Sequence, residues 1–70
     1  MKALFKLYDI YDMPDRELLG RFDSMKEVRA AAKERGDDTD GEWFPALYRY
    51  DEATDKYRPA NFFTGAFETA

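Results

Sequence analysis

The chain has 70 residues, no cysteine, no histidine and a formal net charge of −4. This length suits one small domain spanning residues 1–70, and the lack of cysteine excludes disulfides and thiolate metal sites. The acidic balance argues against nonspecific binding to DNA or anionic membranes, because both depend on an excess of cationic groups. No apolar run reaches membrane-spanning length or resembles a signal peptide, so we expect a cytoplasmic protein with no membrane association.

The first part of the chain predicts a β-hairpin. Residues 2–12 and 17–23 are rich in β-branched, aromatic and other apolar types, which favours strands. Residues 13–16 place Pro14 and Asp15 at the centre of a predicted type I turn.

Pairing Asp12 with Glu17 across that turn would sort the side chains onto two faces. The face expected toward the core carries Phe5, Leu7, Tyr11, Leu18 and Phe22. The other face carries Leu4, Tyr8, Ile10 and Leu19, among Lys6 and Arg21. Asp9 would then lie opposite Gly20 on the core side, where a charge is explained only at the rim of the sheet.

A helix is predicted over residues 25–35. Ser24 and Glu27 have the spacing of a capping box, in which the serine hydroxyl accepts from the Glu27 amide. The apolar residues of this stretch recur at helical period and form a thin stripe: Met25, Val28, Ala31 and Ala32. Gly36 is the residue we expect to end the helix, since glycine readily adopts the left-handed conformation.

Residues 37–42 contain four acidic side chains and invite a calcium-site hypothesis. With Gly41 at the sixth position of an EF-hand loop, the first position is Gly36 and the twelfth is Leu47, so two charged ligands are missing. An improvised site for a hard cation stays open as an alternative. The tripeptide at residues 35–37 matches an integrin-binding motif, but nothing else in the sequence indicates export. We interpret the stretch as a solvated turn and predict no metal site.

The second half predicts another hairpin. Residues 43–50 read as a strand, residues 51–56 as a polar turn and residues 57–60 as a second strand, placed at an edge because Pro59 cannot donate to a ladder. A symmetric pairing would set Arg49 against Arg58, so the register stays open. The fold class is therefore α+β, in the order ββαββ, with a mainly antiparallel sheet and one helix packed on one face. Residues 61–70 form an apolar tail that either packs back or frays.

Catalysis has little support in the sequence. Without histidine or cysteine, and with the only serine, Ser24, assigned to a helix cap, the usual nucleophile–base pairs are missing. A carboxylate pair such as Asp9 with Asp12 could do acid–base chemistry, but a surface role suits these residues better. We predict no enzyme, no catalytic residue and no cofactor.

The aromatic content exceeds what one thin helix can cover. Twelve of the 70 residues are aromatic (17%), so alternation must place some rings on the sheet face away from the helix. Either the tail covers that face, or it binds a protein partner or a second copy, or it stacks single-stranded nucleic acid. We expect a protein-interaction module whose contact residues are Tyr8, Trp43, Tyr48 and Tyr50. In the nucleic-acid alternative, Arg49 and Arg58 would contact phosphates beside these rings.

Overall fold

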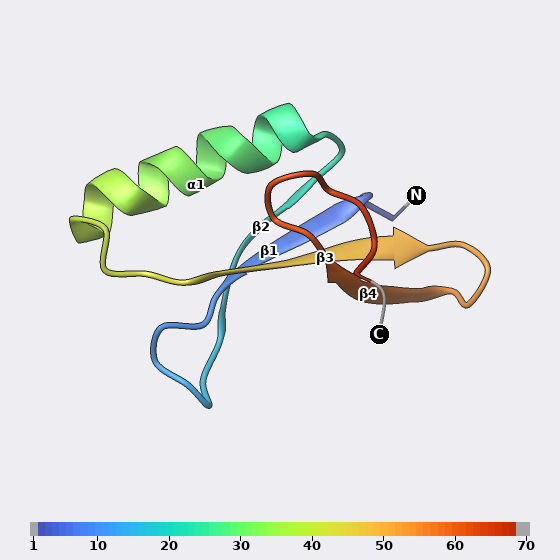
Figure 1. The fold of residues 1–70 in the computed structure, drawn as a ribbon, viewed down its shortest axis with the longest axis horizontal. Helices are drawn as coiled ribbons and strands as arrows, with labels where there is room; N and C mark the ends of the chain where they lie inside the picture. The colour runs from blue at the N-terminus through green and yellow to red at the C-terminus, as the bar shows by residue number, and fades with distance from the viewer. Residues whose placement is uncertain (1, 69–70) are drawn as a thin grey trace.

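The computed structural model describes residues 2–68, which form one four-stranded antiparallel sheet and one helix (Figure 1). The elements in chain order are β1 (Phe5–Asp9), β2 (Glu17–Phe22), α1 (Met25–Thr39), β3 (Pro45–Asp51) and β4 (Lys56–Ala60). The helix lies across one face of the sheet, which confirms the predicted α+β class and the ββαββ order. No helix among the described residues is long and apolar enough to span a membrane.

The strands lie side by side in the order β2-β1-β3-β4, so each hairpin contributes one central and one edge strand. Strand β4, which contains Pro59, is at an edge, as the missing N–H of proline requires. Its register is the symmetric one, with Arg49 directly opposite Arg58. This like-charge pair is accommodated because Arg49 donates to the Gly65 carbonyl (3.0 Å) and Arg58 to the Asp51 carboxylate (2.9 Å).

The register of the first hairpin differs from the prediction. Glu17 pairs with Asp9 instead of Asp12, and the ladder is irregular between Leu7 and Tyr8. Strand β1 ends early because the Tyr11 amide bonds the Asp9 side chain and not the neighbouring strand.

This shift changes the burial and the turn of the hairpin. Tyr11 is exposed instead of lying in the core, whereas Leu19, predicted on the outer face, packs against the core. The predicted type I turn is also wrong, because the turn closes from Asp12 to Asp15 and contains a cis Met13–Pro14 bond.

Helix α1 begins as predicted and ends later than predicted. The Ser24 hydroxyl accepts from the Glu27 amide (3.3 Å), and the Glu27 carboxylate accepts from the Asp23 amide (2.9 Å). The helix then passes through Gly36 to Thr39, so the predicted stop at Gly36 is wrong. Its C-cap is Asp40, which adopts the left-handed conformation at φ 55°. Aspartate tolerates this conformation better than most side chains, so glycine is not needed there.

The core lies between the sheet and α1, and the C-terminal tail extends it. Six apolar residues of the described chain are buried: Phe5, Leu7, Val28, Ala32, Leu47 and Ala60. Residues 61–67 pack on the same side of the sheet as the helix (Figure 1). Gly65 is buried close to Met25 and Phe5, and the Phe63 carbonyl accepts from Arg29 of the helix (3.2 Å).

The predicted alternative in which the tail covers the far face is therefore wrong. The helix contributes few large apolar side chains to the core, and Phe62 of the tail packs against the core beside them. Residues 69 and 70 of the predicted tail lie outside the described residues.

Candidate interaction surface

The face of the sheet away from α1 carries four tyrosines. Paired residues of an antiparallel ladder lie on the same face, and neighbours along a strand alternate between faces. Leu7 of β1 pairs with Leu47 of β3 in the core. The residues next to them along each strand therefore point away from the helix. The tyrosines placed there are Tyr8, Tyr48, Tyr50 and Tyr57, and we call this surface the open tyrosine face.

The four rings form two contacting pairs. Tyr8 and Tyr48, on the two central strands, meet edge to face with ring centroids 5.5 Å apart. Tyr50 and its ladder partner Tyr57 have centroids 5.5 Å apart and planes inclined at 58°. All four rings are half-buried, so they lean on one another while part of each stays in solvent. Rings held in this way lose little conformational freedom on binding, which suits a contact surface.

Cationic side chains lie over these rings. The Arg16 guanidinium is 4.9 Å from the Tyr8 centroid and 5.9 Å from the Tyr48 centroid. Lys6 lies 4.1 Å from the centroid of Tyr57, within the range of a cation–π contact. Two more cations belong to the same surface: Lys2, over Tyr50 at 5.0 Å, and Arg21, the ladder partner of Lys6.

The open tyrosine face is therefore a basic surface on an acidic protein. Lys2 pairs with Asp55 at 2.9 Å, but Lys6, Arg16 and Arg21 form no ion pair with any of residues 2–68. Because the chain as a whole has a net charge of −4, its acidic excess lies elsewhere on the molecule. An acidic ligand would gain favourable electrostatic energy at this face.

Hydrogen bonds fix one edge of the surface. The Tyr50 hydroxyl donates to Asp55, and this bond raises the pKa of Tyr50, with further contributions from burial and from the charge of Asp55. The Tyr57 hydroxyl donates to the Ala3 carbonyl. The Tyr50 phenol therefore stays neutral at physiological pH, and both hydroxyls act as hydrogen-bond donors at this edge.

Three of the four predicted contact residues share this face, and one does not. Tyr8, Tyr48 and Tyr50 lie together, and Tyr57 joins them although it was not predicted as a contact. The sequence signal that could have placed Tyr57 on this face is the symmetric register of the second hairpin, which pairs Tyr57 with Tyr50.

Trp43, the fourth predicted contact residue, does not lie with the tyrosines but on the helix side of the sheet. Strand β3 begins only at Pro45, and Trp43 packs against the core on the helix side, edge to face with Phe62 at 6.2 Å. Gly36 of α1 lies next to its indole nitrogen. An indole held between the helix and the tail in this way contributes to packing of the core.

The two predicted phosphate contacts, Arg49 and Arg58, also lie on the other side of the sheet from the tyrosines. Arg49 and Arg58 point to the helix side, where their guanidinium carbons lie 5.3 Å and 5.1 Å from the ring centroid of Phe67. Arg49 also lies 5.7 Å from the ring of Phe5, which is in the core. The two arginines therefore contact the tail and do not lie beside the tyrosines. Their strand positions alternate with those of the tyrosines, so they point to the other face of the sheet.

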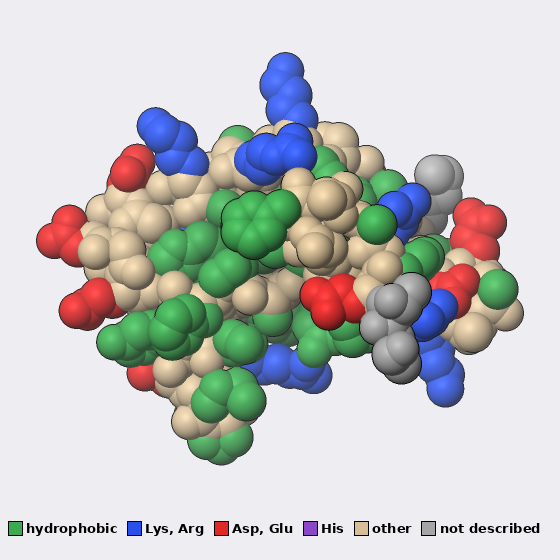
Figure 2. Space-filling view, in the orientation of Figure 1, with side chains coloured by type: hydrophobic (Ala, Val, Ile, Leu, Met, Phe, Trp, Pro, Cys, Tyr) green, Lys and Arg blue, Asp and Glu red, His purple; other side chains and the backbone are tan. Residues whose placement is uncertain are grey.

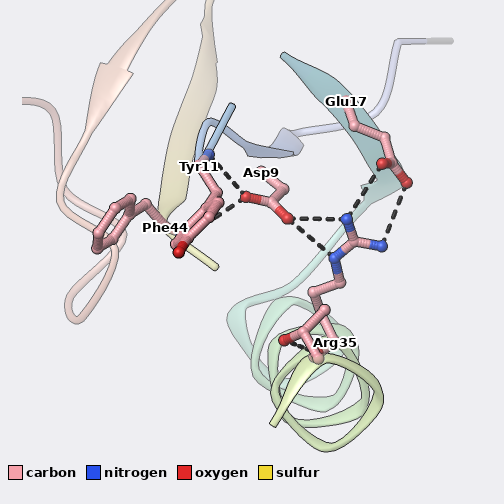
Figure 3. A network of polar contacts seen from close by, with 6 residues as sticks. Asp9, Tyr11, Glu17, Arg35 and Phe44 are labelled. Carbon is pink, nitrogen blue, oxygen red and sulfur yellow. Dashed lines mark hydrogen bonds and ion pairs between the residues drawn. The ribbon is translucent and has the colours of Figure 1, made fainter. Parts of the chain in front are cut away.

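A buried carboxylate organises the adjoining end of the molecule (Figure 3). Asp9 is 7% exposed and uses both oxygens. Its Oδ1 accepts from the Tyr11 amide (2.9 Å) and the Phe44 amide (3.2 Å). Its Oδ2 accepts from Nε (3.0 Å) and Nη2 (2.8 Å) of Arg35, which also donates to Glu17. Asp9 thereby ties together α1, the end of β1, the start of β2 and the entry to β3.

This network accounts for a charge on the core side of the sheet. Burial alone would raise the pKa of Asp9, but the hydrogen bonds from the Tyr11 amide, Arg35 and the Phe44 amide outweigh burial, and the pKa is lowered. The ionised carboxylate is therefore the form that the fold stabilises. Asp9 lies at the rim, where Arg35 can reach it from the last turns of the helix.

Within residues 2–68, no group of three or more aspartates, glutamates, histidines or cysteines is arranged to hold a metal ion. The acidic stretch at 37–42 is divided between the last turn of α1 and the cap and loop that follow. No protein-family model, curated protein or solved structure matches the chain.

Proposed function

We propose that this protein is a non-enzymatic interaction module that binds a protein partner through the open tyrosine face. The observation that carries the proposal is the position of both covering elements: α1 and residues 61–67 lie on the other face of the sheet. Four tyrosines on a rigid sheet, rimmed by cations, are left in contact with solvent. Tyrosine and arginine are enriched at the centres of protein interfaces, where a few such residues supply most of the binding energy.

The charge of the face indicates the chemistry of its partner. Lys6, Arg16 and Arg21 each carry a positive charge without a carboxylate partner on the described chain. Carboxylates of a partner could pair with them while its apolar groups pack on the tyrosine rings. The partner surface is therefore acidic at its rim and apolar at its centre.

Single-stranded nucleic acid is the second candidate ligand. The observation in its favour is that cations lie beside rings on one sheet face, as base-stacking surfaces require, although they are Lys6 and Arg16 and not Arg49 and Arg58. Against it, these cations lie over the rings on which bases would stack, and the net charge of −4 repels a polyanion. The protein partner is therefore the better supported ligand.

The proposal is tested with a double variant of the face, Tyr8→Thr with Tyr48→Thr, because threonine keeps the strand preference and removes the rings. Lys33→Ala, on the exposed surface of α1, is the matched control. A partner would first be captured by cross-linking and then purified. We expect this purified partner to bind the wild type and the control with equal affinity. The double variant should bind it about tenfold more weakly or worse.

Equal affinity of all three proteins for that partner would contradict the proposal. In a separate titration of the wild type with oligothymidylate at low salt, amide shifts of β1 and β3 would favour the nucleic-acid candidate instead. Those shifts should vanish steeply as salt is added, because binding of a polyanion releases counterions.

A further inference from the structure

A second apolar feature protrudes from the end of the molecule that Asp9 organises. Tyr11, Met13 and Phe44 are 45%, 69% and 57% exposed, and we call these three residues the aromatic knob. The rings of Tyr11 and Phe44 stack, with centroids 5.2 Å apart and planes inclined at 27°. Figure 2 shows hydrophobic side chains gathered at the lower left, where Figure 1 places the loop between β1 and β2. Exposed apolar side chains that lie together in this way are found at contact sites.

Hydrogen bonds to a buried carboxylate hold the backbone that carries two of the three knob residues, Tyr11 and Phe44. The Asp9 carboxylate accepts from the backbone amides of both Tyr11 and Phe44, and the Phe44 carbonyl accepts from the Ile10 amide (2.9 Å). Arg35 neutralises that carboxylate from the helix side. The backbone beneath the two stacked rings is thus fixed, so less of its conformational freedom remains to be lost on binding.

The charges near the knob are acidic. The two segments that carry it, residues 10–16 and 40–44, contain four exposed acids: Asp12, Asp15, Asp40 and Glu42. None of these acids forms an ion pair with a residue that the structure describes. The one cation of those segments, Arg16, is turned over the rings of the open tyrosine face. A surface that takes the knob must therefore offer aromatic or apolar groups together with cations.

The open tyrosine face of a second copy has this chemistry. It presents four rings together with Lys6, Arg16 and Arg21, whose charges are unpaired within residues 2–68. Stacking two open faces directly would set these cations against one another, which costs energy. Placing a knob on an open face instead matches rings with rings and acids with cations.

We propose that the protein forms a twofold dimer in which the aromatic knob of each copy packs on the open tyrosine face of the other. Twofold symmetry makes the contact twice and closes the assembly, so two modest contacts act together. The inference rests on the proposed function in one respect, because it takes the open tyrosine face to be a protein contact. It adds the identity of the partner and the residues that the partner contributes.

The experiment is to measure the mass of the whole chain in solution, by sedimentation equilibrium, from micromolar to millimolar concentration. We expect a monomer–dimer equilibrium that weakens as salt is added, since acid–cation pairs contribute to it. Met13→Ser with Phe44→Ser should lower the association constant by about tenfold or more, and so should Tyr8→Thr with Tyr48→Thr. Lys33→Ala should leave the association constant unchanged, and circular dichroism would check that each variant is folded.

Mixing the two double variants gives the sharpest test. The knob variant retains an intact open face and the face variant retains an intact knob, so one of the two contacts can form between them. We expect the mixture to contain heterodimers under conditions where each variant alone is monomeric. A mixture that stays monomeric would overturn the reciprocal arrangement.

A wild-type chain that is monomeric at millimolar concentration would overturn the dimer, as would a dimer that the knob variant does not weaken. The proposed function fails separately. If the wild type is a monomer and a captured partner no longer binds the variant Tyr8→Thr with Tyr48→Thr, the open face remains a protein contact. That result would remove only self-association. A dimer that depends on Met13 and Phe44 but not on Tyr8 and Tyr48 would overturn the docking of the knob on the open face and leave the proposed function to the binding test with the captured partner.

Discussion

The two faces of the sheet use aromatic and charged residues in opposite ways. One face, which we call the closed face, is covered by α1 and residues 61–67. There Phe5 is buried, and the buried carboxylate of Asp9 has a hydrogen-bond partner at each oxygen. On the open face, the rings of Tyr8 and Tyr48 are half-buried, and cations such as Arg16 lie over them without an ion-pair partner in the described chain. The same residue classes therefore stabilise the fold on one side and form a candidate contact on the other.

The difference teaches how a chain of 70 residues divides its composition between stability and contact. A domain of this size buries only a modest fraction of its surface, so the closed face needs both the helix and residues 61–67 to exclude water. Changes on the closed face should therefore affect unfolding strongly. Changes on the open face should affect unfolding weakly and binding strongly.

The largest effect is expected from Asp9→Ala. The substitution removes the acceptor of two backbone amides and the partner of Arg35, and breaking a buried ion pair costs about 3–5 kcal/mol. Chemical denaturation should show this loss or an unfolded protein. Asp55→Asn is the control: it removes the charge of a 73% exposed carboxylate from an ion pair with Lys2 and keeps a side chain suited to the left-handed backbone at φ 54°, so it should unfold close to the wild type. Similar behaviour of the two variants would refute the special role of Asp9.

The same carboxylate predicts a pH dependence. The folded protein holds the pKa of Asp9 below its ordinary value of 3.8, so the ionised group stabilises the fold above that value. This stabilisation is lost as the pH falls through the lowered pKa. The difference in unfolding free energy between wild type and Asp9→Asn should therefore be largest near neutral pH and shrink in acid. A difference that is constant over this range would contradict the assignment.

Gly65→Ala tests how closely the tail seals the closed face. An added Cβ would lie 2.8 Å from Cγ and Sδ of Met25, in a residue with φ of +79°. We expect a loss of about 1–3 kcal/mol in denaturation experiments, from crowding together with backbone strain. Gly41→Ala, at φ +82° with no atom within 4 Å of the added Cβ, isolates the backbone part and should cost less.

On the open face, Tyr48→Thr should cost little stability. The substitution loses the edge-to-face contact with Tyr8, which is worth about 0.5–1.5 kcal/mol, while threonine keeps a good strand preference. Denaturation should give a loss of about 1–2 kcal/mol, because the half-buried ring also gives up the apolar area that it covers. A loss as large as that of Asp9→Ala would mean that the open face is a core surface, and the contrast between the faces would fail.

The smallest effect has the opposite sign. Gly36 lies inside α1, and an alanine Cβ there would meet the Trp43 indole nitrogen at an ordinary 3.5 Å. Gly36→Ala should therefore raise the unfolding free energy by about 0.5–1 kcal/mol, because glycine weakens helix interiors. A loss of stability would instead support a left-handed glycine that ends the helix at this point.

The local chemistry of the sequence was sufficient to predict the order of the elements, the start of the helix and the edge position of one strand. Ser24 with Glu27 caps a helix through neighbouring amides, and Pro59 lacks an N–H wherever the chain runs, so both act without distant partners. Alternation likewise put Tyr48 and Tyr50 on one face, because strand periodicity is a property of the backbone.

Only the tertiary structure decided which distant groups meet. The ladder irregularity after Leu7, the course of the helix through Gly36 and the packing of Trp43 beneath it all depend on contacts between separate segments. The tail covers the helix side, where Gly65 lies close to Met25 and Phe5, a contact that no local pattern reveals. Asp9 is the clearest case: a strand position that looked unfavourable for a charge becomes stable once Arg35 and two amides converge on it.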